Sequence, residues 1–323
     1  MTAAACRRIG PWTVPAVGYG AMVLSPGMYE GAGDEAGLKT LGHVIERGML
    51  IDTSDVYGRD FHNERLIGEA LRRHRQHGRA VVATKFGQRI PPGATPHPVV
   101  FAGGKRPVMV NAEPQYVRQY AVASLTRLGV ERIDLWYPHF PDPEVPIAET
   151  VGAMADVVAA GLVAHIGLSD VTAAQLREAA SVHPISAVQT EWSLWHPIDG
   201  DLRAAADEAG AAIVAWWPLG AGALTGPASE LAPTDLRASF DQFSAERAGE
   251  RARLHTAIAG CADRIGATPA QVALAWLLHQ HDSVVPIPGT RQPGRVDENL
   301  AAAAITLPDE EQAALTHAAR PRE

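Results

Sequence analysis

Short apolar segments alternate with longer segments of helical periodicity along most of the chain. The apolar segments are continuous, which is typical of strands buried on both faces of a parallel sheet, and the longer segments have the spacing of amphipathic helices. The predicted strands are Val14–Gly20, Leu50–Asp52, Ala80–Lys85, Ile133–Pro138, Ala164–Leu168, Ala187–Glu191, Ala212–Trp216 and Val284–Ile287. The predicted helices are Asp34–Arg47, Asn63–Arg73, Pro114–Leu128, Ile147–Ala160, Thr172–Ser181, Gly200–Ala209, Thr268–His279 and Gly294–Ala304.

This alternation predicts an α/β fold, an eight-stranded parallel β/α (TIM) barrel. The alternative is an open doubly wound sheet, which would carry a glycine fingerprint between its first strand and first helix. Gly18-Tyr19-Gly20 lacks the third glycine, and the glycines of Gly220–Gly226 do not precede a convincing helix. No linker divides the chain, so residues 1–323 are expected to form a single domain.

Three insertions interrupt the alternation: Gln88–Glu113, Leu224–Ser239 and Phe240–Ile265, the last of which contains an extra predicted helix. Long loops in a compact domain are usually functional or mobile. Since all three follow predicted strands, they are expected at the carboxyl face of the barrel.

Ionisable residues lie at or directly after the ends of three predicted strands. Asp52 ends the second strand, Lys85 ends the third, and His139 directly follows the fourth, while Tyr57 lies five residues beyond Asp52. The carboxyl ends of barrel strands share one face, so these four side chains are expected in one pocket. Each alone is more simply explained as a cap, a packing residue or a solvated loop residue. The complete set favours an active site.

Composition restricts the possible partners. The net charge of −8 argues against nucleic acid and anionic membranes as partners. No apolar run is long enough to span a membrane. The two cysteines, Cys6 and Cys261, suggest no disulfide or metal framework, and a cytoplasmic protein without a metal site is expected.

Six segments carry motifs that occur together, in this order, in one known family. They are Ile51–Gly58, Asn63–Gly68, Ala83–Gly87, Ile166–Ser169, Val188–Glu191 and Pro286–Arg291. Together they resemble the aldo-keto reductases, and the resemblance extends from about Val14 to Leu307.

The resemblance implies reduction of an aldehyde or ketone by NADPH. Tyr57 would donate the proton, Lys85 would lower the pKa of Tyr57, and Asp52 would hold Lys85 charged. His139 would hydrogen-bond the carbonyl oxygen and orient the substrate.

The resemblance also implies an extended cofactor over the carboxyl face. Ser169 and Gln189 match contacts to the nicotinamide carboxamide, and Trp216 matches a ring that stacks on nicotinamide. Asp170 departs from the asparagine of many family members. Arg291 is expected to bind the 2′-phosphate, which would favour NADPH over NADH. The expected cofactor residues are Gly20, Met22, Asp52, Ser169, Gln189, Trp216, Leu219, Gly220, Gly222, Leu224, Gly289, Thr290, Arg291, Arg295, Glu298 and Asn299.

The substrate pocket is expected to be mostly apolar and aromatic, which favours a hydrophobic small-molecule carbonyl compound. Its expected walls are Met22, Val23, Tyr57, Phe86, Trp136, His139, Phe140, Trp192 and the insertion after Lys85. Two other functions stay open on the residues alone. They are a nicotinamide-binding regulatory protein and a barrel isomerase or lyase that uses Lys85 as a Schiff base.

Overall fold

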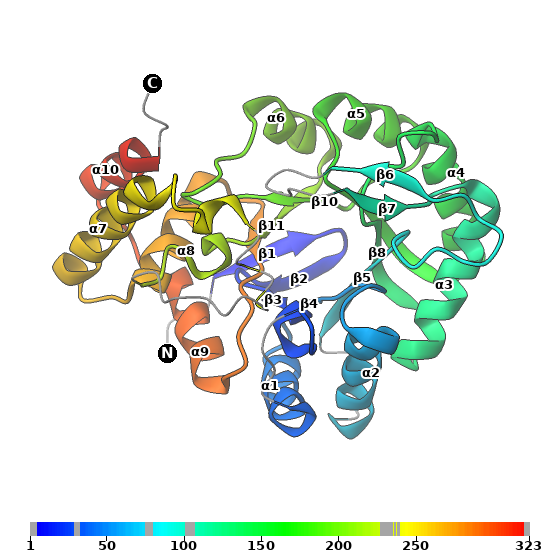
Figure 1. Cartoon of the computed structure of the whole chain (residues 1–323), viewed down its shortest axis with the longest axis horizontal. Helices are drawn as coiled ribbons and strands as arrows, with labels where there is room; N and C mark the ends of the chain where they lie inside the picture. The colour runs from blue at the N-terminus through cyan, green and yellow to red at the C-terminus, as the bar shows by residue number, and fades with distance from the viewer. Residues whose placement is uncertain are drawn as a thin grey trace.

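The structure is a computed structural model that describes residues 5–28, 33–74, 80–100, 107–226, 235, 237 and 240–319. In these residues the central sheet has eight parallel strands that follow one another in sequence order, with helices outside them (Figure 1). The strands are β3 (Tyr19–Gly20), β4 (Leu50–Asp52), β5 (Val81–Phe86), β8 (Ile133–Pro138), β9 (Val163–Ser169), β10 (Ala187–Glu191), β11 (Ala212–Trp216) and β12 (Val284–Pro286).

Hydrogen bonds between the segments around β3 and β12, the two ends of this sheet, nearly close it into a barrel. The amide of Gly18 donates to the carbonyl oxygen of Pro286 at 2.9 Å, and the amide of Gly20 donates to that of Pro288 at 3.3 Å. A Cβ atom at Gly20 would lie 2.7 Å from the carbonyl oxygen of Ile287, so only glycine allows this approach. The predicted β/α barrel is confirmed.

Each predicted helix is present within a few residues of its expected ends. The barrel helices are α1 (Asp34–Glu46), α2 (His62–His74), α3 (Pro114–Leu128), α4 (Ile147–Ala159), α5 (Ala173–Val182), α6 (Gly200–Ala209), α8 (Pro269–Gln280) and α9 (Pro293–Ala301). Their apolar faces pack on the outside of the sheet and form the larger hydrophobic core. None of the described helices is both long and apolar enough to cross a bilayer.

The predicted first strand, Val14–Gly20, is wrong in its bounds. Its first part belongs to β2 (Trp12–Pro15), which pairs antiparallel with β1 (Cys6–Ile9). Ile9 and Val14 pack against apolar side chains inside the barrel, so this hairpin covers an end of the interior core. Only β3 remains of the predicted strand, because the chain must leave the hairpin before it joins the sheet.

The insertions are only partly described. Within Gln88–Glu113, β6 (His97–Val99) and β7 (Val108–Val110) form an antiparallel hairpin, and residues 101–106 lie outside the described residues. Of Leu224–Ser239, only residues 224–226, 235 and 237 are described. The helix predicted within Phe240–Ile265 is present as α7 (Ala248–Ile265).

One further helix, α10 (Asp309–Ala319), was not expected. It packs against α7 and is joined to it by an ion pair between Arg264 and Glu311, with Nε 2.5 Å from Oε1.

Candidate active site

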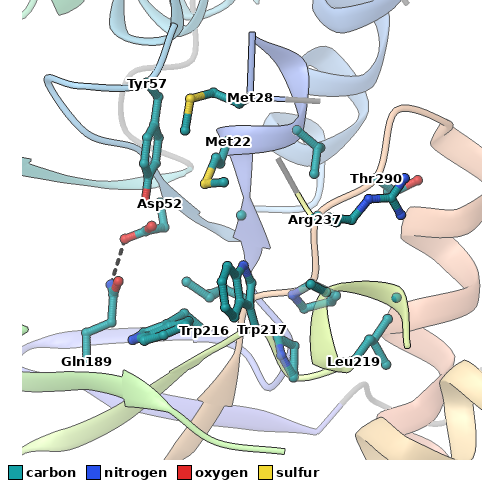
Figure 2. A pocket seen from close by; sticks show the side chains of 18 of the residues that line it. Met22, Met28, Asp52, Tyr57, Gln189, Trp216, Trp217, Leu219, Arg237 and Thr290 are labelled. Atoms are coloured by element: carbon teal, nitrogen blue, oxygen red, sulfur yellow. Dashed lines mark hydrogen bonds between the residues drawn. The ribbon is translucent and has the colours of Figure 1, made fainter. Parts of the chain in front are cut away.

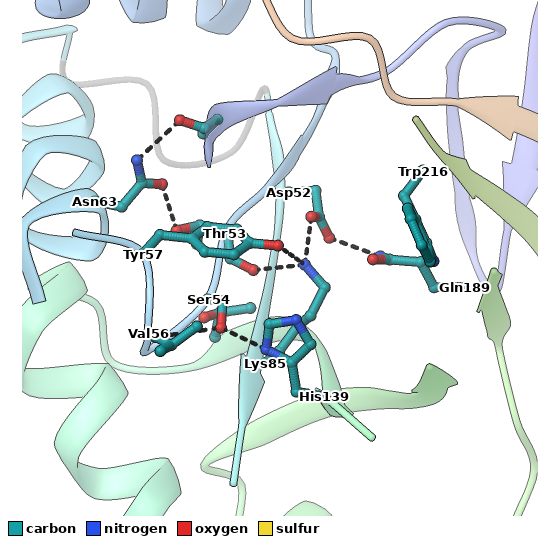
Figure 3. Close-up of polar contacts among 12 residues, drawn as sticks. Asp52, Thr53, Ser54, Val56, Tyr57, Asn63, Lys85, His139, Gln189 and Trp216 are labelled. Carbon is teal, nitrogen blue, oxygen red and sulfur yellow. Dashed lines mark hydrogen bonds and ion pairs between the residues drawn. The ribbon is translucent and has the colours of Figure 1, made fainter. Parts of the chain in front are cut away.

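The four predicted catalytic residues lie together at the carboxyl ends of β4, β5 and β8. The ammonium of Lys85 lies 2.5 Å from Oδ1 of Asp52, 2.9 Å from the carbonyl oxygen of Thr53 and 3.2 Å from the hydroxyl of Tyr57 (Figure 3). Lys85 is 1% exposed and Asp52 3%, so their charges interact out of water. Lys85 lies behind Tyr57 and Asp52, which both line the cavity described below.

The loop that carries Tyr57 is held by a buried hydrogen-bond network. The hydroxyl of Thr53 donates to Oδ1 of Asn63 at 2.6 Å, and Nδ2 of Asn63 donates to the carbonyl oxygen of Ala21 at 2.9 Å. Asn63 belongs to the first turn of α2, so the network joins β4, the helix and the segment after β3. These contacts fix the loop, and with it Tyr57, relative to Lys85.

His139 directly follows β8, and its ring lies between polar and aromatic neighbours. Its Nδ1 lies 2.9 Å from Oγ of Ser54, and its ring is stacked on Phe140 at 4.9 Å between centroids. Burial and the nearby charge of Lys85 hold the pKa of His139 well below its usual range, so the ring is neutral. Ser54 was not predicted from the sequence, although its place between Asp52 and Tyr57 could have indicated it.

Charge and burial oppose each other at the catalytic residues. Burial lowers the pKa of Lys85, but the charges and hydrogen bonds of Asp52 and Tyr57 together outweigh it, and the pKa is raised. Burial raises the pKa of Asp52, and the Lys85 ammonium opposes that shift. Burial also raises the pKa of Tyr57, with Lys85 opposing. Lys85 lowers the pKa of Tyr57 as expected, but burial outweighs this effect, so the net shift is upward.

A cavity of about 630 Å³ opens beside these residues. At its catalytic end, Nε2 of Gln189 donates to Oδ2 of Asp52 at 2.7 Å, and Ser169 lines the wall nearby. The indole N–H of Trp216 donates to Oδ1 of Asp170 at 3.3 Å. Figure 2 shows Met22 and Met28 across this part of the cavity from Trp216 and Trp217.

The other end of the cavity is lined by the segment after β12 and the first turns of α9. The expected cofactor residues found on the wall of the whole cavity are Gly20, Met22, Asp52, Ser169, Gln189, Trp216, Leu219, Gly222, Gly289, Thr290, Arg291, Arg295 and Asn299. Arg237, which was not predicted, also lines the cavity and forms an ion pair with Asp235 at 2.7 Å. This end therefore presents three guanidinium groups, from Arg237, Arg291 and Arg295.

Three expected cofactor residues do not lie on the cavity wall. Gly220 and Leu224 are buried beside each other in the loop after β11. Glu298 accepts a hydrogen bond from the hydroxyl of Thr268 at 2.7 Å, which turns its carboxylate toward α8.

Three expected substrate-pocket residues lie in the core instead: Phe86, Trp136 and Trp192. Successive side chains of a strand point to opposite faces, so Phe86 points away from the interior that Lys85 faces. Phe86 stacks on Trp136 at 4.2 Å between centroids, under the helices. Val23, Tyr57, His139 and Phe140 do line the cavity, as expected.

Several lining residues were not predicted, because they come from loops whose conformation the sequence pattern does not specify. They are Met28, Val56, Trp217 and Phe240, among others. Gln88 and Val108 also line the cavity, and both lie in the insertion after Lys85 that was expected to contribute to the wall.

Comparison with known proteins supports this description. A model of the aldo/keto reductase family matches residues 16–320. The chain belongs to the aldo/keto reductase family. The resemblance found in the sequence motifs is thus confirmed, and the protein belongs to a family of oxidoreductases. "Probable aldo-keto reductase 1" from Glycine max is 37% identical over 303 residues, which cover 92% of this chain and 83% of the relative.

Solved structures share the fold. A glycerol dehydrogenase from Gluconobacter oxydans superposes with a TM-score of 0.83 at 26% identity, covering 100% of this chain and 98% of that one. An aldo-keto reductase from Klebsiella pneumoniae, solved in complex with NADPH, has a TM-score of 0.74 at 24% identity, with 98% and 95% covered. At this identity the second likeness concerns the fold alone.

Proposed function

We propose that this protein, as a single domain of residues 1–323, reduces an aldehyde or ketone to an alcohol with NADPH. The observation that carries the proposal is the position of Tyr57. Its hydroxyl accepts a hydrogen bond from the buried Lys85 ammonium at 3.2 Å, and the residue lines a cavity able to hold a ligand. A phenol held beside an ammonium and facing a pocket is suited to general acid catalysis.

The residues of the cavity fit a nicotinamide dinucleotide phosphate. Trp216 offers a flat aromatic face near Ser169 and Gln189, whose polar groups suit a carboxamide. The guanidinium groups at the other end suit phosphates, and Arg291 lies just before the start of α9. Asp297 lies on that helix but is paired with Arg47 at 2.7 Å, so its carboxylate does not compete for Arg291.

The bound cofactor would supply the hydride, and the protein would supply the proton and the orientation. Burial keeps Tyr57 protonated at neutral pH, so it donates its proton to the carbonyl oxygen. Lys85 stabilises the phenolate that results, and Asp52 keeps Lys85 charged. Oγ of Ser54 lies nearer to Nδ1 of His139, at 2.9 Å, than to Oδ1 of Asp55, at 3.3 Å. We therefore assign the Ser54 proton to His139 Nδ1, which leaves Nε2–H to bind the substrate oxygen.

The walls around Tyr57 favour a hydrophobic carbonyl substrate. Met28, Val56, Val108, Phe140 and Trp217 line the cavity, and apolar walls bind apolar groups by removing them from water.

The test is to replace Tyr57 with phenylalanine. Tyr57→Phe should bind NADPH as the unmutated protein does, because the ring keeps its shape. It should lose carbonyl reduction by about 10²–10⁴-fold, the usual contribution of general acid catalysis. NADPH oxidation is measured with a panel of aldehydes and ketones, and NADPH binding by tryptophan fluorescence. Retention of most of the turnover would exclude Tyr57 as the acid. NADPH binding by the unmutated protein without turnover of any carbonyl would favour a regulatory role.

A further inference from the structure

Two carboxyl groups that interact with each other lie without a close cation near the catalytic end of the cavity, and one of them lines its wall. Asp170 directly follows Ser169 at the end of β9, lines the cavity, and accepts the indole N–H of Trp216. Glu191 ends β10 and is 4% exposed. It lies two residues beyond Gln189, so its side chain leaves the strand on the same face as the Gln189 amide.

The cation at the catalytic end of the cavity, Lys85, does not pair with either carboxyl group. Lys85 is paired with Asp52 at 2.5 Å, and within the described part of the chain neither Asp170 nor Glu191 forms an ion pair. Burial raises the pKa of Asp170 to about 7, with the Trp216 hydrogen bond and Lys85 opposing. Burial, and then the charge of Asp170, raise the pKa of Glu191 to about 8. Asp170 thus titrates near neutral pH while Glu191 is mostly protonated.

We propose that Asp170 makes the site discriminate between oxidised and reduced nicotinamide, through a carboxylate beside Trp216 that attracts the cationic ring. The proposal rests on the proposed function, since it requires nicotinamide at Trp216. The two forms of the cofactor differ at this end by one unit of charge, because the oxidised ring is cationic and the reduced ring is neutral. A carboxylate at the edge of the ring-binding surface stabilises the first form and not the second.

The sign of the pH dependence follows from the charge of Asp170. Below its pKa the carboxyl is neutral, so it contributes equally to the binding of NADP⁺ and of NADPH. As the pH rises through 7, Asp170 ionises, and NADP⁺ should bind more tightly relative to NADPH. If NADP⁺ lowers the pKa of Asp170 by about one unit, the ratio of the two dissociation constants changes by about tenfold.

The other charged groups that face Asp170 do not produce this change. Lys85 from β5 and Asp52 from β4 form a buried pair of opposite charges. Tyr57, from the loop after β4, has a pKa raised by burial and stays protonated. Glu191, from β10, titrates about one pH unit higher than Asp170. The 2′-phosphate of the cofactor titrates as well, but it is common to both forms and cancels in the ratio.

The experiment measures the dissociation constants of NADP⁺ and NADPH between pH 6 and 9 by isothermal titration calorimetry. In the unmutated protein the NADP⁺/NADPH ratio of dissociation constants should fall about tenfold with rising pH. Asp170→Asn should flatten this dependence. Asparagine keeps an oxygen for Trp216 and tolerates the left-handed backbone of this position, where φ is 54°. Glu191→Gln is the matched control, and it should keep a fall centred near pH 7.

The outcomes separate the two proposals. Failure of the unmutated protein to bind either cofactor would refute the proposed function. Binding of both with a ratio independent of pH would refute only the role of Asp170. That role is equally refuted if Asp170→Asn keeps the pH dependence, or if Glu191→Gln abolishes it. Should Asp170→Asn fail to fold, the ratio measured on the unmutated protein and on Glu191→Gln still decides.

Discussion

The buried pair of Lys85 and Asp52 should behave as one unit in stability measurements. Two unit charges 2.5 Å apart attract by about 7 kcal/mol at an effective dielectric constant of about 20. Their removal from water offsets much of this gain. Removing one partner leaves the other charge buried and unpaired, and should cost about 3–5 kcal/mol.

A double-mutant cycle measures the coupling. Asp52→Asn keeps the shape of the side chain, and Lys85→Met keeps most of its apolar length. Each single variant should lose about 3–5 kcal/mol of unfolding free energy. The loss in the double variant should be smaller than the sum of the two single losses by at least about 2 kcal/mol. Equilibrium urea unfolding without cofactor gives the four free energies. Additive costs would refute the coupling.

The pH dependence of Asp52→Asn gives a second check. In the unmutated protein the pKa of Lys85 is raised, so its contribution to stability is fully present below the unfolded value of about 10.4 and is lost above the folded value. Without the Asp52 charge, burial should push the pKa of Lys85 below its unfolded value. The variant should then gain stability as the pH rises from 7 toward 10. A stability that falls over this range would contradict the reasoning.

Three further predictions concern the cofactor, the histidine and the barrel. Arg291→Ala should weaken NADPH binding by about 2–5 kcal/mol and hardly affect NADH, measured by titration of both cofactors; equal affinity of the unmutated protein for both would contradict it. Ser54→Ala frees Nδ1 of His139, so kcat for carbonyl reduction should fall about tenfold with unchanged NADPH affinity, in steady-state kinetics and titration; an unchanged kcat excludes the contact. Gly167→Ala places a Cβ atom 2.4 Å from Cε1 of Tyr137 and should cost about 1–3 kcal/mol in urea unfolding. Its control, Gly152→Ala, meets no atom within 4 Å and should be neutral or stabilising.

The fold was predictable because its determinants are local and repeated. Continuous apolar strands and amphipathic helices alternate through the chain, and each predicted helix is present within a few residues of its expected ends. The β1–β2 hairpin escaped prediction because Trp12–Pro15 continues into apolar residues without a clear break. Its position depends on contacts with strands distant in sequence, such as that of Ile9 with the interior core.

The catalytic residues were predictable because the barrel itself brings strand ends together. The pocket walls were less so, since the side of a strand on which a residue lies changes at each position. Lys85 and Phe86 are adjacent in sequence, yet one belongs to the active site and the other stacks on Trp136 under the helices. An error of one residue exchanges the two faces of a strand, which is enough to place an aromatic side chain such as Phe86 in the pocket instead of the outer core.

Asp52 and Asp170 show why electrostatic roles need the structure. Both are aspartates at the carboxyl ends of barrel strands; Asp52 is buried and Asp170 is half-buried. Asp52 faces an ammonium from the neighbouring strand, so its charge is balanced and holds a catalytic residue in place. Asp170 faces an indole N–H, which hydrogen-bonds the carboxylate without balancing its charge. Local sequence is similar for the two residues, while the partner that decides between them comes from another strand. The unbalanced charge of Asp170 can therefore be recognised only once the strands are assembled. A cationic ring stacked on Trp216 would balance it.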